Sequence, residues 1–227
     1  MATFFLRKKL GHALVCGISI VFVVLSFGYS VFLSQIKVVP IYTSFYFLAT
    51  EELHVEAGAE LIKLEGGAGY VLCLDGKEYA VSAVYLKESE GESVRAAMLQ
   101  CGKAVRLLPI QIDNLYLRGS DKKKEKVYTS ALNLLNGCIS LLQECVEYLD
   151  NGATQESIKR ILLILRRQMV YISAQYNKEC AIFSRLCTQS ARELQNIENE
   201  IIYASDLRYL TCQMVDDYIT LCRQFAL

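Results

Sequence analysis

An unbroken apolar run near the N-terminus is the first pattern along the chain. Residues 11–36 contain no Asp, Glu, Lys or Arg, and Arg7, Lys8 and Lys9 stand just before them. A bilayer core about 30 Å thick needs roughly 20 apolar residues of helix, so this run predicts a transmembrane anchor. The basic cluster on its N-terminal side predicts a cytoplasmic tail at residues 1–10 and an extracytoplasmic C-terminus. We therefore expect a single-pass protein of the cell membrane, in contact with the lipid bilayer.

A cleaved signal peptide is the alternative interpretation of this run. Gly28-Tyr29-Ser30 is a small-x-small triplet of the kind that signal peptidase accepts. The apolar run is longer than the roughly 7–15 residues of a usual signal-peptide core, and apolar residues continue past the triplet. These two features favour the uncleaved anchor, and both interpretations place the rest of the chain outside the cytoplasm.

Residues 42–112 change their hydrophobic period repeatedly, in the order β-α-β-β-α-β. Aromatic or alternating runs predict strands, apolar residues at every third or fourth position predict helices, and Asp75-Gly76 predicts a tight hairpin turn. The predicted elements are strand 43–48, helix 54–64, strands 70–74 and 77–86, helix 88–100 and strand 104–112. This order predicts a four-stranded antiparallel sheet with both helices on one face.

A polar linker is predicted at 113–126, and residues 127–227 have a purely helical period. Asp150-Asn151-Gly152 predicts the end of the first helix, and Thr154 predicts the start of the next. No Gly or Pro follows Thr154, which leaves two alternatives: one very long helix, or two helices with a break near Tyr203 to Asp206. A three-helix bundle packs these apolar stripes best. The predicted fold class is therefore α+β, with an N-terminal transmembrane helix, a four-stranded sheet with two helices, and a C-terminal α-helical bundle.

Composition narrows the classes of function. The chain of 227 residues has 24 basic and 24 acidic side chains, so its net charge of zero gives no electrostatic case for a nucleic-acid partner. Of its nine cysteines, Cys138 and Cys145 are seven residues apart, as are Cys180 and Cys187. This spacing places each pair on one helical face among apolar residues, which favours free, buried thiols over disulfides.

Candidate chemistry is sparse. The two histidines are His12 and His54, and no nucleophile accompanies the group formed by His54, Glu56 and Glu60, so no catalytic residue is predicted and the chain is not expected to be an enzyme. No Cys or His cluster has metal-ligand spacing, and no cofactor is predicted. The glycine-rich segment 66–69 lacks the Lys and Ser/Thr of a phosphate loop, and we interpret it as a permissive connection after a helix.

The segment 42–112 resembles a known family. Residues 44–49 occupy its first strand, residues 79–85 its third strand, and residues 94–99 with 103–107 its last helix and strand. In order and length they resemble the SPOR domain, a small envelope module that binds peptidoglycan. An anchor followed by such a domain resembles the stage II sporulation protein B type of arrangement. Tyr46 stands where the family often has Gln.

The resemblance implies a glycan-binding surface on the sheet. We expect one face to pack against the two helices, and its predicted residues are Phe45, Phe47, Val81, Val105 and Leu107. The other, open face is predicted to carry Ser44, Tyr46, Leu48, Ala80, Ser82, Val84 and Arg106. Its aromatic and polar members suit stacking on sugars and hydrogen bonding to them, so the predicted glycan-binding residues are Ser44, Tyr46, Ser82 and Arg106. The alternative is that the C-terminal bundle covers this face.

The expected function is non-catalytic binding of peptidoglycan or another cell-wall glycan, for localisation or scaffolding in division or sporulation. The alternative is a structural subunit of a membrane protein complex, held through its helices and without glycan binding. Residues 161–165 are all apolar, which widens one helical face beyond the need of a single core. That excess indicates a possible protein partner at the C-terminal helices, or the membrane surface.

Overall fold

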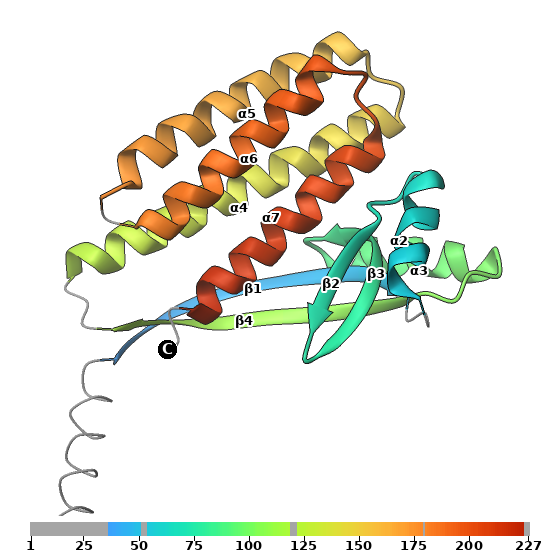
Figure 1. The fold of residues 1–227 in the computed structure, drawn as a ribbon. Coiled ribbons are helices and arrows are strands. Elements are labelled where there is room, and N and C mark those ends of the chain that lie inside the picture. The colour runs from blue at the N-terminus through green and yellow to red at the C-terminus, as the bar shows by residue number, and fades with distance from the viewer. Residues whose placement is uncertain (1–35, 51–53, 119–121, 179, 225–227) are drawn as a thin grey trace, which may run out of the picture.

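The computed structural model describes residues 36–50, 54–118, 122–178 and 180–224. These residues form an α+β structure, in which a four-stranded antiparallel sheet is joined to six helices (Figure 1).

The predicted membrane anchor requires a correction. None of the helices in the described ranges has the length and apolarity that crossing a membrane requires, because each long helix has a charged face. Residues 11–35 of the predicted span lie outside the described residues, and its last residue, Ile36, begins a strand. The predicted fold class was therefore wrong in its transmembrane helix. The predicted location, single-pass in the cell membrane with a cytoplasmic N-terminus and an extracytoplasmic C-terminus, loses its support with that helix.

The sheet has the predicted order of elements. They are β1 (Ile36–Thr50), α2 (Val55–Leu64), β2 (Tyr70–Leu74), β3 (Lys77–Tyr85), α3 (Glu88–Gln100) and β4 (Arg106–Arg118). The strand order β2-β3-β1-β4 is that of a split β-α-β unit. The hairpin between β2 and β3 turns at Asp75 and Gly76, which both have positive φ (52° and 76°), as the Asp-Gly pair predicts. Strand β4 continues to Arg118, so the segment predicted as a linker is largely strand and helix.

Four helices follow the sheet, where three were predicted. They are α4 (Lys122–Asp150), α5 (Gln155–Tyr176), α6 (Ala181–Asn199) and α7 (Ala204–Gln224). Each helix packs against the next, and α7 packs back against α4, which closes the bundle. Thr154 caps α5 as expected, because its side-chain oxygen accepts a hydrogen bond of 3.3 Å from the Ser157 backbone N–H.

The break near residue 203 is confirmed, but the break between α5 and α6 was missed. No Gly or Pro marks it. The chain instead turns where Tyr176 and Phe183 pack edge to face, with ring centroids 5.5 Å apart. Folding back at this point buries both rings against the bundle, which a continuous helix does not achieve.

Helix α7 is shared by the sheet and the bundle. The ring of Tyr218 packs edge to face on Phe45 of β1 at 5.3 Å, and Tyr209 packs on Tyr70 of β2 at 5.4 Å. The sheet face that carries Phe45 and Phe47 therefore meets the bundle, whereas the sequence predicted that it would meet α2 and α3. Figure 1 shows α7 lying directly over the strands, with the other bundle helices beyond it.

Helix α3 lies on the other face of the sheet. A side chain at Gly91 would clash with Leu107, and Leu107 is paired with Leu48 on the face opposite Phe47. Leu48 is buried there, so both faces of the sheet are covered around these residues.

The cysteines behave as their spacing predicts. Six thiols are buried and free: Cys138, Cys145, Cys180, Cys187, Cys212 and Cys222. Burial raises the pKa of the Cys187 thiol to about 12, so it stays protonated at neutral pH. These residues act as small core hydrophobes.

Two adjacent carboxylates lie on α7. The Tyr70 hydroxyl donates a hydrogen bond of 2.7 Å to Asp216, and burial is the main cause of the raised pKa of that hydroxyl. Asp217 is partly buried, and this burial, together with the charges of Asp216 and Glu193, raises its pKa to about 6.

We predict that Phe45→Ala lowers the free energy of unfolding by about 3–5 kcal/mol, because it opens a cavity between β1 and α7. Urea denaturation followed by circular dichroism measures this change. Tyr42→Ala is the matched control on the same strand, since Tyr42 is 85% exposed and its loss is expected to change stability by less than about 0.5 kcal/mol. Equal effects of the two substitutions would contradict the packing of α7 on this face.

We predict that Asp217→Asn stabilises the protein at pH 8 by about 1–2 kcal/mol, after allowance for solvent screening of a partly exposed carboxylate. The folded state holds this proton up to a pKa of about 6, whereas the unfolded state releases it near pH 4. Stability therefore falls as the pH rises between these values, and the amide removes that loss. Thermal melts at pH 4 and pH 8 should show the gain only at the higher pH. A gain of the same size at both values would refute this explanation.

Candidate binding site at the junction of sheet and bundle

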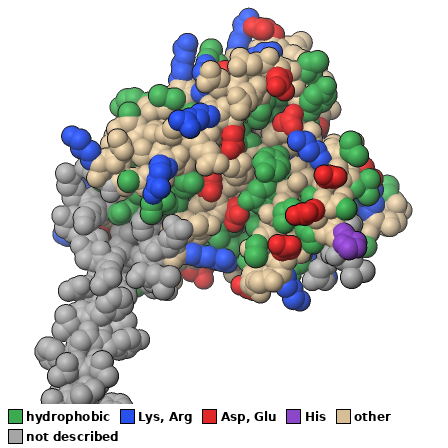
Figure 2. All heavy atoms as spheres, in the orientation of Figure 1, with side chains coloured by type: hydrophobic (Ala, Val, Ile, Leu, Met, Phe, Trp, Pro, Cys, Tyr) green, Lys and Arg blue, Asp and Glu red, His purple; other side chains and the backbone are tan. Residues whose placement is uncertain are grey.

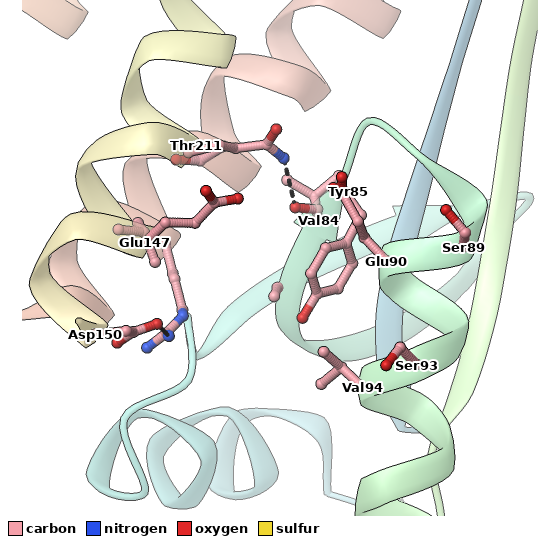
Figure 3. A pocket seen from close by; sticks show the side chains of 13 residues that line it. Val84, Tyr85, Ser89, Glu90, Ser93, Val94, Glu147, Asp150 and Thr211 are labelled. Carbon is pink, nitrogen blue, oxygen red and sulfur yellow. Dashed lines mark hydrogen bonds and ion pairs between the residues drawn. The ribbon is translucent and has the colours of Figure 1, made fainter.

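A cavity of about 540 Å³ lies where the end of β3, the start of α3, the end of α4 and the first half of α7 meet (Figure 3). Both apolar and polar side chains line it. The lining residues are Ala83, Val84, Tyr85, Ser89, Glu90, Ser93, Val94, Gln143, Val146, Glu147, Asp150, Arg208 and Thr211.

The end of β3 creates this opening. Strand β2 pairs with β3 only from Leu74 to Tyr70, so the last residues of β3 extend beyond it. The Gln143 side chain of α4 donates a hydrogen bond of 2.8 Å to the Val84 carbonyl. This carbonyl thereby gains a hydrogen-bond partner, and the bundle is linked to the strand. This hydrogen bond is the dashed line beside Val84 in Figure 3.

Arg208 holds the bundle end of the cavity in place. Its guanidinium donates one hydrogen bond of 2.6 Å to the Gly66 carbonyl, in the connection from α2 to β2, and another to the Asp150 carboxylate at the end of α4. One side chain of α7 therefore fixes both the sheet unit and α4.

The cavity has a surplus of negative charge. Asp150 is paired with Arg208, and Glu90 is paired with Lys87 at 2.6 Å. Glu147 points into the cavity, and no ion pair engages it within the described part of the chain. The site is therefore suited to neutral or cationic ligands and disfavours anions.

Tyr85 supplies an aromatic wall. Burial raises the pKa of its hydroxyl, although the charge of Arg208 acts in the opposite direction. The hydroxyl is therefore protonated at neutral pH and serves as a hydrogen-bond donor. Together with Ser89 and Ser93 of α3, it places hydroxyl groups on the α3 side of the cavity, where Glu90 also lies, while Glu147 and Asp150 lie on the α4 side.

The lining residues include no His or Cys, and the described residues hold no group of His, Cys, Asp and Glu that could bind a metal ion. What the arrangement offers is hydrogen bonding and stacking.

The four predicted glycan-binding residues do not share one surface. Ser44 and Tyr46 are half-buried on the face that carries α3. Ser82 is buried, and its hydroxyl donates a hydrogen bond of 3.0 Å to the Leu48 carbonyl. Arg106 is paired with Ala49, which places it on the opposite face from Tyr46. The prediction of a common open face was therefore wrong, while a role in glycan binding for any single residue stays a prediction.

Sequence reasoning missed the junction cavity because its residues come from four segments that are far apart in the chain. At residues 84–86, Val-Tyr-Leu stands where the SPOR domain frequently has Gly-Pro-Phe, a departure from the family pattern that gave no sign of a cavity.

Comparison with family models, with curated proteins and with solved structures finds no match to this chain. The resemblance to the SPOR domain thus rests on element order and apolar spacing alone.

We predict that Arg208→Met lowers the free energy of unfolding by about 1–3 kcal/mol, because the Gly66 carbonyl and the Asp150 carboxylate lose a shared charged donor. Arg160→Met is the matched control, since Arg160 is exposed and its one ion pair within the described ranges is with Glu156 on the same helix. Urea denaturation should give a clearly lower free energy of unfolding for Arg208→Met than for Arg160→Met. If both changed stability equally, Arg208 would not be the link between the sheet unit and the bundle.

Proposed function

We propose that the chain is a non-catalytic glycan-binding module and that the junction cavity holds the sugar. The observation that carries this proposal is the composition of the cavity lining: one aromatic ring, four aliphatic side chains, and hydroxyl, amide and carboxylate groups.

Sugars suit such a lining. A pyranose ring has apolar C–H faces and a rim of hydroxyl groups, so it binds where an aromatic ring lies beside hydrogen-bonding side chains. In this cavity the Tyr85 ring offers the stacking surface, and Glu147 offers two acceptor oxygens to hydroxyl groups. A volume of about 540 Å³ lies within the range of small-ligand sites and admits one or two sugar rings.

The charge of the cavity narrows the sugar class. Its negative surplus favours neutral sugars, such as N-acetylated amino sugars, over uronic acids or sugar phosphates. The resemblance of residues 42–112 to the SPOR domain supports the same class, since it implies peptidoglycan or another cell-wall glycan as the ligand.

A structural subunit of a protein complex is the second candidate function. It is favoured by apolar side chains that α5 leaves exposed, at Ile164, Val170 and Tyr171. In that case the bundle supplies the binding surface and the cavity is incidental.

We predict that a variant combining Tyr85→Phe with Glu147→Gln binds a tetramer of N-acetylglucosamine about tenfold or more weakly than the native chain, because it loses two hydrogen bonds to the sugar. Isothermal titration calorimetry measures the affinity, and sedimentation with purified peptidoglycan sacculi measures binding to the polymer. Both substitutions nearly conserve volume, so the fold is expected to persist.

Glu144→Gln is the matched control, on the same helix α4 but outside the cavity, and it should bind like the native chain. Tyr46→Ala tests the sheet face that the sequence singled out. If Tyr46→Ala abolished binding while the cavity variant retained it, the site would lie on the sheet. If the native chain bound neither oligosaccharide nor sacculi, the proposed function would fail and the second candidate would remain.

A further inference from the structure

A groove runs between α5 and α6 on the outer side of the bundle. It encloses about 550 Å³, and its floor is made of small residues because the two helices approach closely there. Ser173 of α5 hydrogen-bonds to the Ser184 carbonyl at 2.9 Å and to the Thr188 hydroxyl at 2.7 Å. These contacts between small side chains hold the helices together and leave the groove open above them.

The rim of this groove is basic. Arg166, Arg185 and Arg192 line it, and an adjoining hollow adds Arg167. Arg166 pairs with Glu198 at 3.2 Å, whereas no carboxylate of the described residues lies within ion-pairing distance of the other three. Figure 2 shows Lys and Arg side chains over the upper and left helices of the view, while Asp and Glu side chains run down its middle and lower right.

The groove is also partly apolar. Val170 of the groove is 56% exposed, and Tyr171 of the adjoining hollow is 69% exposed, although both are on a helix whose other face is packed in the core. A surface that is basic and apolar together fits a partner helix that presents acidic and apolar side chains on one face.

Helix α2 of this chain has such a face. Leu61 is 56% exposed and Leu64 is 86% exposed. Glu56 and Glu60 are exposed on the same helix, one turn apart, and neither is ion-paired within the described ranges. The one basic residue of α2, Lys63, is already paired with Asp206 at 3.3 Å.

We propose that copies of this chain associate head to tail, with α2 of one copy seated in the α5–α6 groove of the next. The two leucines cover the apolar part of the groove, and Glu56 and Glu60 meet its arginines. In Figure 1, α2 lies at the end of the sheet and the α5–α6 pair at the top of the bundle. The two surfaces of one copy are therefore distinct, and we expect the contact to extend from copy to copy rather than to be reciprocal within a pair.

The contact is expected to be weak and sensitive to salt. A helix of ten residues is about 15 Å long and buries less than a standard interface, so dissociation constants on the order of 10 μM are expected. Exposed charges are screened beyond about 10 Å at 0.1 M salt, so raising the salt concentration should loosen the assembly.

The test is sedimentation equilibrium of the full-length chain from about 1 to 100 μM, at low and at high salt. We expect the weight-average mass to rise with concentration past that of a dimer at low salt, and to fall at high salt. The double variant Arg185→Glu with Arg192→Glu reverses the charge of the groove. The double variant Glu56→Arg with Glu60→Arg reverses the charge of α2. Each double variant alone should be at least tenfold weaker in association.

The mixture of the two double variants decides the question. The acidic groove of the first variant then binds the basic α2 of the second, and the native groove of the second binds the native α2 of the first. Mixing should therefore restore association to within a few-fold of the native level. Circular dichroism checks that each variant is folded. Lys159→Glu with Arg160→Glu is the matched control, because it makes the same change of net charge on α5 outside the groove and should leave association unchanged.

Three results would overturn the proposal: a native chain that stays monomeric over the whole range, a mixture that fails to associate, or a control that weakens association equally. A monomeric chain that binds vesicles of anionic lipid would assign the groove to a lipid surface instead. Because neither α2 nor the groove lines the junction cavity, all these variants should bind glycan as the native chain does, which separates this proposal from the proposed function.

Discussion

The structure depends on the burial of one helix from two sides. Helix α7 packs its Tyr218 ring against Phe45 of the sheet, while Leu210, Val215 and Ile219 are also removed from solvent in the same core cluster. The hydrophobic contribution to stability is proportional to the apolar area removed from water. A helix covered on both sides therefore stabilises the fold more than a surface helix of equal length does. The sheet unit and the bundle therefore share one core. The junction cavity is a consequence of this packing, since α7 and α4 approach β3 beyond the point where β2 ends.

Apolar packing alone does not fix the angle or register at which α7 meets the sheet. Directional polar contacts do so: Arg208 reaches both Gly66 and Asp150, and Tyr70 binds Asp216. Each has a partner with defined geometry, and an alternative docking would leave these partly buried groups unsatisfied. Asp217 is the exception, because its carboxylate has no such partner among the residues that the structure describes, and burial raises its pKa. The polar contacts of α7 therefore specify one arrangement, at some cost in stability at this residue.

Local patterns predicted the order of strands and helices, the Asp75-Gly76 turn and the Thr154 cap, because each is determined by residues near it in the chain. Local patterns did not predict the features that depend on residues far apart in the chain. The register of β1 shifts between Pro40 and Thr43 against β4, and between Leu48 and Ala49 against β3. Since neighbouring residues of a strand point to opposite faces, and Arg106 pairs with Ala49, three residues after Tyr46, Arg106 lies on the opposite side from Tyr46. The break between α5 and α6 has no Gly or Pro, and only the packing of the helices onto one another explains it. The cavity draws on four separated segments, which no local pattern joins.

A net charge of zero conceals two surfaces of opposite character. The junction cavity is acidic, whereas the α5–α6 groove is basic. Between residues 155 and 199, Lys and Arg outnumber Asp and Glu by seven to four, so the segregation is already present in the sequence. Charge selects partners mainly by excluding those of the same sign. The carboxylates of the cavity repel an acidic helix, and the arginines of the groove attract it. A neutral sugar is not drawn to either surface by charge. It depends on hydrogen bonds and on the Tyr85 ring, which the cavity provides. The two surfaces are therefore able to bind their partners independently.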